Sequence, residues 1–287
     1  MKLTLGTAQF GLDYGISNNI GRVDQKDVEK ILKVAKNAGI SSLDTASDYG
    51  SSEKVLGISN IREFEIISKF GAIPDPKTDI KQWLYDKVKG SLELLNIDKL
   101  HAYLLHKPTD LLSQNGENIY KTLCDLKAQG FIDNIGISIY DPSELELLIR
   151  NFDFDIVQAP MNVFDRRLYT SGWLNYLKEQ EIEVHVRSVF LQGLLLMDAK
   201  QRPESFNKWS HLFKNFDIWL MEESISALEA CLGFVKEFEH VDKIIVGVNS
   251  LPQLINIIKV MENNKKINAP YNLYSEVDEL INPVKWS

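Results

Sequence analysis

Four side chains that can hold or transfer protons lie in the first part of the chain, namely Asp44, Tyr49, Lys69 and His106. A phenol, with an ordinary pKa of about 10, is protonated at neutral pH and is a weak proton donor. A nearby ammonium lowers that pKa and eases proton donation, and a buried ammonium needs a carboxylate partner. A neutral imidazole can hydrogen-bond a carbonyl oxygen and orient it. Together these groups suit protonation of a carbonyl that receives a hydride.

The elements that must position these residues alternate regularly along the chain. Short β-branched runs predict eight strands, and the amphipathic stretches between them predict helices. The strands are expected at Leu3–Thr7, Ser42–Ala46, Phe64–Lys69, Lys99–His106, Asn134–Ser138, Ile156–Ala159, Glu183–Val189 and Lys243–Val248. The helices are expected at Gln25–Ala38, Glu53–Ile58, Ile80–Leu95, Asn118–Gln129, Pro142–Asn151, Gly172–Gln180, Ser224–Phe238 and Pro252–Glu262.

Strict alternation of strands and helices indicates parallel strands joined by right-handed crossovers, and eight such repeats close into a (β/α)8 TIM barrel. An open doubly wound sheet is the rival fold. It is less favoured because no Gly-x-Gly-x-x-Gly follows the first strand and no Walker A sequence occurs. No linker rich in Pro, Gly or Ser divides the chain, so we expect one domain over residues 1–287. The longest irregular stretch is expected at Asp198–Phe216, where it could cover the barrel mouth.

The catalytic groups of such a barrel project from the C-terminal ends of its strands. Asp44 ends the second predicted strand and Tyr49 lies in the following loop, while Lys69 and His106 end the third and fourth. Each also has a purely structural interpretation, because Asp44 can cap a helix, Tyr49 can pack, and Lys69 and His106 can be solvated loop residues. A chance arrangement is much harder to accept when all four residues lie at or just after the ends of neighbouring strands. This pattern favours a catalytic site.

Composition excludes several function classes. The chain has 32 Lys and Arg against 40 Asp and Glu, and this net charge of -8 disfavours nucleic-acid and anionic-membrane partners. The two cysteines, Cys124 and Cys231, form no Cys-x-x-Cys pair, which disfavours a disulfide framework and fits a reducing cytoplasm. No run approaches about 18 apolar residues, so no membrane span is expected. The histidines show no ligand spacing, and we expect no metal site.

Several segments, taken in order, resemble the signature blocks of the aldo-keto reductase superfamily. They are Leu43–Ala46 with Tyr49–Gly57, Ile67–Lys69, Leu105–Pro108, Gly130–Ser138, Val157–Asn162 and Arg187–Leu195. As a set they span nearly the whole chain and are highly specific. The resemblance implies reduction of a small aldehyde or ketone, sugar-like carbonyls included, to an alcohol with NADP(H) or NAD(H). It makes Tyr49 the general acid, Lys69 the modulator of its pKa, Asp44 the partner of Lys69, and His106 the group that orients the carbonyl.

The resemblance also implies residues for the nicotinamide and the pyrophosphate. Ser138 and Gln158 match residues that hold the nicotinamide carboxamide, although Ile139 replaces a common asparagine. The turn that binds the pyrophosphate is matched by Ser188, Leu191 and Gly193. Arg187 stands where an aromatic ring commonly stacks on the nicotinamide. A planar guanidinium can also stack, but its charge would disfavour the oxidised, cationic ring.

The segment Gly247–Leu254 matches the site that holds the 2′-phosphate of NADPH in relatives. It includes Gly247, Asn249 and Gln253 but neither Lys nor Arg. A helix N-terminus can still accept a phosphate without basic side chains. We therefore expect only modest discrimination against NADH. The sequence leaves the preference between the two cofactors, and the oligomeric state, undetermined.

The substrate and two other functions remain open. Several polar residues could reach the barrel mouth and would suit a hydroxylated or anionic carbonyl such as a keto-sugar, namely Asp13, Tyr14, Lys107, Arg166 and Arg187. A Schiff-base aldolase or lyase would use Lys69 as its nucleophile, and borohydride trapping would then label that lysine. A non-catalytic, nucleotide-sensing subunit would bind a cofactor that no carbonyl oxidises.

Overall fold

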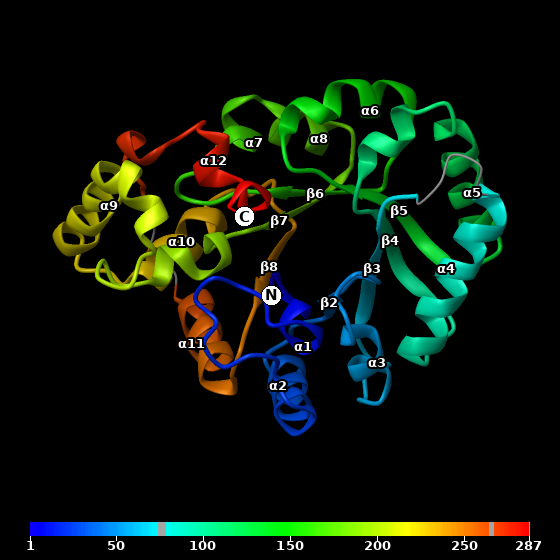
Figure 1. Cartoon of the computed structure of the whole chain (residues 1–287), viewed down its shortest axis with the longest axis horizontal. Helices are drawn as coiled ribbons and strands as arrows, with labels where there is room; N and C mark the ends of the chain where they lie inside the picture. Colours follow the sequence, from blue (N-terminus) through cyan, green and yellow to red (C-terminus); the bar gives the residue numbers. More distant parts are fainter. Residues whose placement is uncertain (74–78, 264–266, 287) are drawn as a thin grey trace.

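The computed structural model describes residues 1–73, 79–263 and 267–286 (Figure 1). Eight parallel strands close into a barrel and follow one another around it in sequence order. They are β1 (Leu3–Gly6), β2 (Ser42–Asp44), β3 (Glu65–Phe70), β4 (Leu100–Leu105), β5 (Ile132–Ser138), β6 (Ile156–Pro160), β7 (Glu183–Arg187) and β8 (Lys243–Gly247). Every predicted strand is present within a few residues of its expected bounds, and the (β/α)8 barrel is confirmed.

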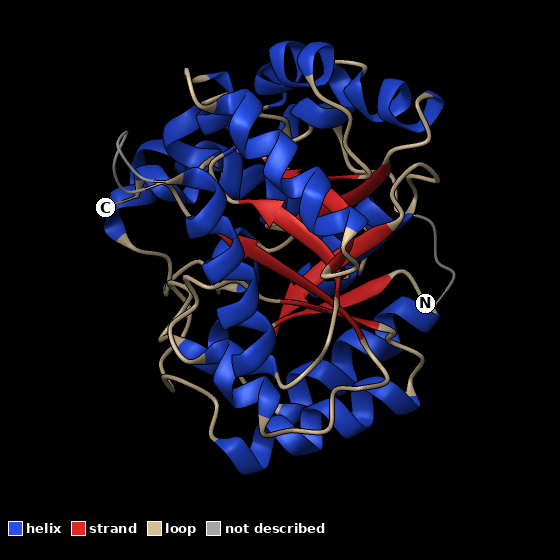
Figure 2. Cartoon of the chain, turned by 90° about the vertical axis from the view of Figure 1, so that its right-hand side faces the viewer, coloured by secondary structure: helices blue, strands red, loops and turns tan. Residues whose placement is uncertain are grey.

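Helices surround the strands on the outside of the barrel (Figure 2). One helix follows each strand, and these are α2 (Gln25–Asn37), α3 (Ser52–Gly57), α4 (Ile80–Leu95), α5 (Gly116–Ala128), α6 (Leu145–Asn151), α8 (Trp173–Glu179), α10 (Ala227–Lys236) and α11 (Leu251–Glu262). Additional short or inserted helices are α1 (Ala8–Gly11), α7 (Arg167–Thr170), α9 (Ser210–Glu222) and α12 (Asp278–Ile281). The 3-10 helices are η1 (Pro108–Leu112), η2 (Pro142–Glu144), η3 (Leu191–Leu196), η4 (Glu204–Trp209), η5 (Tyr271–Leu273) and η6 (Pro283–Lys285). Within the described ranges, none of the helices combines the length and apolarity needed to cross a bilayer.

Helix α2 shows how the sequence fixes these elements. The Asp24 side chain accepts a hydrogen bond from the backbone N–H of Asp27, which satisfies an unpaired donor at the helix start. The buried face repeats at helical spacing and consists of Val28, Ile31, Leu32 and Ala35. Gly39 follows the helix with a φ of +78°, a conformation that glycine adopts without strain.

The segment Asp198–Phe216 differs from the prediction. It is irregular only at first, because η4 forms at Glu204–Trp209 and α9 begins at Ser210. The apolar period of α9 is present in the sequence, since Leu212, Phe213, Phe216 and Trp219 are all buried. This segment was expected to cover the barrel mouth. Asp198 lines the cavity there, whereas the residues after it border a separate hollow of about 550 Å³. Helix α9 lies at the periphery of the molecule, in yellow in Figure 1.

The barrel interior has an apolar layer beneath a polar one. Four buried apolar side chains form a cluster separate from the main core, and they are Ile67, Ala102, Leu104 and Ile156. Side chains two residues apart on a strand share a face, so Lys69 and Gln158 lie one step above Ile67 and Ile156, nearer the C-terminal ends. The polar groups at the mouth therefore rest on a close-packed apolar floor.

Candidate active site

A cavity of about 700 Å³ opens among the loops at the C-terminal ends of the strands. Asp44, Tyr49 and His106 line it, and Lys69 lies behind its wall with no exposed surface. The ring centroids of Tyr49 and His106 are 5.8 Å apart, and Lys69 Nζ lies 5.1 Å from the Tyr49 centroid. The structure thus brings together all four residues proposed from the sequence.

Lys69 and Asp44 form a buried ion pair. Lys69 Nζ donates to Asp44 Oδ1 at 2.6 Å and to the Thr45 carbonyl at 3.0 Å. The other carboxylate oxygen of Asp44 accepts from Gln158 Nε2 at 2.8 Å. Burial lowers the pKa of Lys69, and the Asp44 carboxylate opposes that lowering. A nucleophilic lysine must reach its substrate, so complete burial of Lys69 argues against the Schiff-base alternative.

The protonation behaviour of Tyr49 differs from the sequence-based expectation. Burial raises the pKa of the Tyr49 phenol above its ordinary value, and the Asp44 carboxylate raises it further. The Arg187 guanidinium acts in the opposite direction but does not outweigh burial. Tyr49 is therefore a protonated donor throughout the physiological range, and the expected net lowering by Lys69 is not seen in this structure.

His106 is held as a neutral imidazole. Burial, reinforced by the positive charge of Lys69, lowers the pKa of His106 to about 4. Its Nδ1 lies 3.9 Å from Oδ2 of Asp48, which is too long for a hydrogen bond. Asp48 also lines the cavity, although sequence reasoning did not select it. Its position directly before Tyr49 in the sequence could have indicated that Asp48 lies at the same site.

Close backbone packing fixes the loop that carries Tyr49. A Cβ on Gly11 would lie 1.8 Å from the carbonyl oxygen of Tyr49, so only glycine fits there. Gly50 follows with a φ of +57°, and a Cβ there would lie 2.5 Å from the Gly11 oxygen. The Ser52 hydroxyl then donates to the Thr7 carbonyl at 2.9 Å. The β2–α3 loop is thus seated directly on α1.

A chain of polar contacts continues across β5, β6 and β7. The Ser138 hydroxyl donates to Gln158 Oε1 at 3.2 Å, and Arg187 Nε donates to the Ser138 oxygen at 3.3 Å. Gln158 and Arg187 line the cavity, whereas Ser138 is fully buried behind them. The Arg187 guanidinium lies 4.4 Å from the centroid of the Tyr140 ring, which also borders the cavity.

Most of the other proposed cofactor-binding residues also reach the cavity, namely Ser188, Gly193, Gly247, Asn249 and Gln253. Leu191 does not, because its side chain is fully buried in the main core. The backbone around it is unusual, with positive φ at Ser188, Leu191, Gln192 and Gly193. Gln9 was missed from the sequence. It lines the cavity, and its buried Oε1 has no hydrogen-bond partner within the described chain.

Only some of the residues expected at the mouth are there. Tyr14 and Arg187 line the cavity, but Asp13, Lys107 and Arg166 do not. Arg166 is buried and donates to the carbonyl oxygens of Ala269 and Pro270 at 3.2 and 2.7 Å, so its predicted position was wrong.

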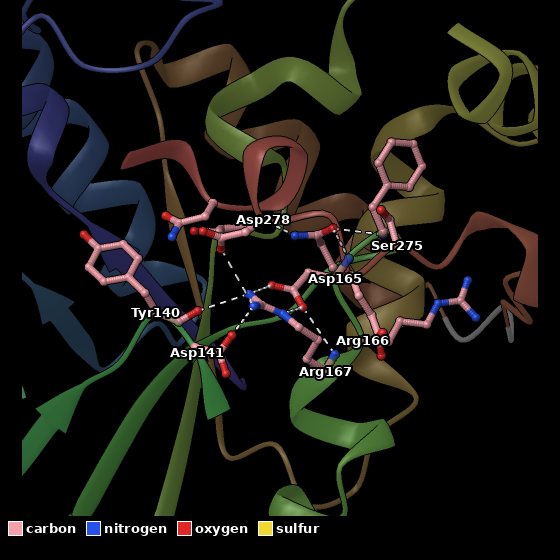
Figure 3. A network of polar contacts seen from close by, with 12 residues as sticks. Tyr140, Asp141, Asp165, Arg166, Arg167, Ser275 and Asp278 are labelled. Atoms are coloured by element: carbon pink, nitrogen blue, oxygen red, sulfur yellow. Dashed lines mark hydrogen bonds and ion pairs between the residues drawn. The ribbon is translucent and has the colours of Figure 1, made fainter. Parts of the chain in front are cut away.

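The neighbouring Arg167 forms a polar network that sequence reasoning did not identify (Figure 3). It pairs with the buried Asp165 at 2.9 Å and donates to the Tyr140 carbonyl at 3.1 Å. It also contacts Asp141 and, at 3.9 Å, Asp278 of α12. The loop that carries Tyr140 is thereby tied to α7 and to the C-terminal segment.

Comparison with known proteins defines the class. The model of the Aldo/keto reductase family matches residues 2–276, and the chain belongs to this family. It is therefore an oxidoreductase of a carbonyl-reducing family.

Individual relatives agree with this assignment. "Uncharacterized oxidoreductase YqkF" of Bacillus subtilis is 27% identical over 274 residues, covering 88% of each chain. D-arabinose 1-dehydrogenase of Saccharomyces cerevisiae is 23% identical over 248 residues, covering 79% of this chain and 74% of the relative. The holo form of aldo-keto reductase AKR11C1 from Bacillus halodurans shares the fold, with a TM-score of 0.72, 20% identity, and coverage of 93% of this chain and 88% of that one.

Proposed function

We propose that residues 1–287 act as one domain that reduces a small aldehyde or ketone to the alcohol with NADPH or NADH. The observation that carries this proposal is the meeting of Tyr49, neutral His106 and the buried Lys69–Asp44 pair at one cavity. The cavity volume of about 700 Å³ falls within the range of cofactor and small-ligand sites.

Each of the four residues has a distinct role in this reaction. NADPH or NADH, when bound, would supply the hydride for the carbonyl carbon. Tyr49 donates its proton to the carbonyl oxygen, which becomes more basic than a phenolate as it takes on alkoxide character. Lys69 then stabilises the Tyr49 phenolate, and Asp44 compensates the Lys69 charge before the proton moves. His106, as a neutral donor, orients the same oxygen.

The cavity wall offers groups suited to a dinucleotide. The Gln158 amide is already oriented by Ser138 and Asp44, and it keeps one acceptor lone pair and one N–H for a carboxamide. The unpaired Gln9 Oε1 offers another acceptor. Ser188 and the backbone N–H groups of the turn that ends at Gly193 suit a pyrophosphate, as do other backbone concavities that bind anions.

The substrate end of the cavity is polar and favours a hydroxylated carbonyl. Tyr14, Asp48 and Tyr140 line it alongside the catalytic groups. Phenols and a carboxylate can hydrogen-bond hydroxyl groups, which an unsubstituted aliphatic aldehyde lacks. The similarity to D-arabinose 1-dehydrogenase supports a sugar-like substrate of this kind.

Titration of nicotinamide fluorescence with NADPH and NADH, followed by turnover of aldehydes and keto-sugars, tests this function. In Tyr49→Phe we expect unchanged cofactor binding and at least about a hundredfold loss of turnover, the usual contribution of a positioned general acid. Tyr176→Phe is the matched control, because Tyr176 is exposed and outside the cavity. Full activity in the Tyr49 variant would exclude its role as the acid, and no turnover of any carbonyl despite cofactor binding would favour a sensing subunit.

A further inference from the structure

Arg187 places a positive charge in the cavity wall that has no direct carboxylate partner among the described residues. Among the described residues that line the cavity, it is the one Lys or Arg. Its guanidinium donates to neutral oxygens, namely Ser188 Oγ at 3.2 Å and the Ile139 carbonyl at 2.8 Å, besides Ser138. No carboxylate oxygen lies within 4.0 Å of it in the part of the chain that is described. Lys69 differs, because Asp44 neutralises it at 2.6 Å.

The surrounding structure holds this charge in place. The guanidinium lies against the Tyr140 ring, and the Tyr140 backbone is anchored by Arg167, which is itself paired with buried Asp165 (Figure 3). A flexible cation would turn towards bulk water, but three hydrogen bonds and an aromatic face restrict Arg187 to the wall.

The field of Arg187 extends over the reacting groups. Burial is the largest influence on these groups, raising the pKa of Tyr49 and lowering those of Lys69 and His106, and the nearby Arg187 charge acts to lower the pKa of all three. A carbonyl that accepts a proton from Tyr49 must lie in this field, and so must a nicotinamide that delivers hydride to that carbonyl. The oxidised nicotinamide ring carries a positive charge, whereas the reduced ring is neutral. Arg187 therefore repels one redox form only.

We propose that Arg187 makes the cavity selective for the redox state of its cofactor, so that NAD(P)H binds more tightly than NAD(P)+. This inference rests on the proposed function. For an assumed separation of about 8–12 Å between the guanidinium and the nicotinamide ring, two unit charges at an effective dielectric constant of about 20 change an affinity roughly ten- to thirtyfold. Two carboxylates that also line the cavity, Asp48 and Asp198, reduce this effect only in part, because both residues are exposed and screened by water.

The selectivity has a consequence for turnover. By linkage, each tenfold difference between the two dissociation constants raises the midpoint potential of the bound two-electron couple by about 30 mV. The oxidised cofactor then leaves easily after each reduction and inhibits weakly as a product. The same rise in potential makes the bound reduced cofactor a weaker hydride donor, so this wall favours release of the oxidised cofactor rather than the hydride transfer itself.

Calorimetric titration with NADPH, NADP+, NADH and NAD+ tests the proposal without any carbonyl substrate. In the wild-type protein we expect the reduced form to bind at least about tenfold more tightly than the oxidised form of the same cofactor. In Arg187→Gln that ratio should fall to within about threefold of unity, mainly through tighter binding of the oxidised form. Arg187→Lys keeps the charge and should retain most of the ratio.

Lys107→Gln is the matched control, because Lys107 lies outside the cavity lining and pairs with Asp110 at 3.3 Å. It removes one positive charge near His106 and should leave the ratio unchanged. A wild-type ratio below about threefold, or the wild-type ratio in a folded Arg187→Gln variant, would refute this inference but not the proposed function. If Arg187→Gln does not fold, the inference is tested by the ratio of the two dissociation constants in the wild-type protein and in Arg187→Lys. Failure of every nucleotide to bind would refute the proposed function together with this inference.

Discussion

Replacing Lys69 with methionine tests how far the buried ion pair supports both fold and chemistry. Methionine preserves most of the side-chain length and volume but removes the ammonium. Asp44, only 3% exposed, would keep Gln158 Nε2 as a side-chain donor and lose the 2.6 Å contact with Lys69. Breaking a buried pair in this way costs about 3–5 kcal/mol, against a total stability of about 5–15 kcal/mol for typical proteins. We therefore expect a folded protein with a large loss in its free energy of unfolding.

Urea denaturation of Lys69→Met, Asp44→Asn and the double variant would measure this coupling. Because the double variant leaves no unpaired buried charge, it should be less destabilised than the sum of the single variants by at least about 1 kcal/mol. Lys81→Met provides the matched control. Lys81 pairs with Asp125 at 3.3 Å but is 66% exposed, so its removal should cost no more than about 1 kcal/mol.

The kinetic effect of Lys69→Met should accompany the loss of stability. Without the ammonium, the phenolate of Tyr49 loses a stabilising charge, so turnover should fall and any limb of the pH–rate profile that reports Tyr49 should move to higher pH. Equal stability of Lys69→Met and Lys81→Met, together with an unchanged pH–rate profile, would refute both the energetic and the chemical reasoning.

Three further predictions follow from the site. Because the pKa of His106 is lowered to about 4, kcat/KM should show no inflection near 6.5 and should fall only as pH approaches about 4, where the imidazole becomes charged. Wild-type protein should bind NADPH less than about a hundredfold more tightly than NADH, and Asn249→Arg should raise that ratio in fluorescence titrations. Gly11→Ala should displace Tyr49, lower kcat and cost roughly 1–3 kcal/mol in thermal unfolding, whereas Gly90→Ala, with open space around its Cβ, should be neutral or stabilising.

The barrel, and the clustering of four candidate catalytic residues in it, could be predicted from the sequence because both follow from the strand boundaries. Each apolar run ends where a polar side chain begins, and closure of parallel strands places those ends together. We could place Asp44, Lys69 and His106 at the C-terminal ends of their strands without knowing any contact between distant parts of the chain. The helix that begins at Ser210 was also encoded, since its buried residues follow helical spacing, but charged and aromatic residues around it obscured the pattern.

Other features depend on partners far away in the sequence. Arg166 was expected among the polar residues at the mouth, yet carbonyls more than 100 residues away, at Ala269 and Pro270, accept its hydrogen bonds inside the protein. The Asp48 carboxylate occupies space that Gly71 leaves open, since a Cβ at Gly71 would come within 2.2 Å of it and the carboxylate would have to shift. The raised pKa of Tyr49 likewise depends on burial by the assembled loops rather than on its neighbours in sequence.

In the proposed reaction, the Lys69–Asp44 pair and Arg187 contribute differently to the charge of the cavity. The Lys69–Asp44 pair is neutral before reaction, so it adds little net charge to the cavity, whereas Arg187 remains unpaired. In the proposed reduction, negative charge would pass from the carbonyl oxygen to Tyr49, where both cations would stabilise it, although Arg187 would also oppose the positive charge that develops on the nicotinamide. Interactions that strengthen only as charge develops accelerate the chemical step. Because the apolar floor beneath Lys69 cannot screen these charges, the Lys69–Asp44 pair would favour the proposed proton transfer, whereas Arg187 would favour release of the oxidised cofactor.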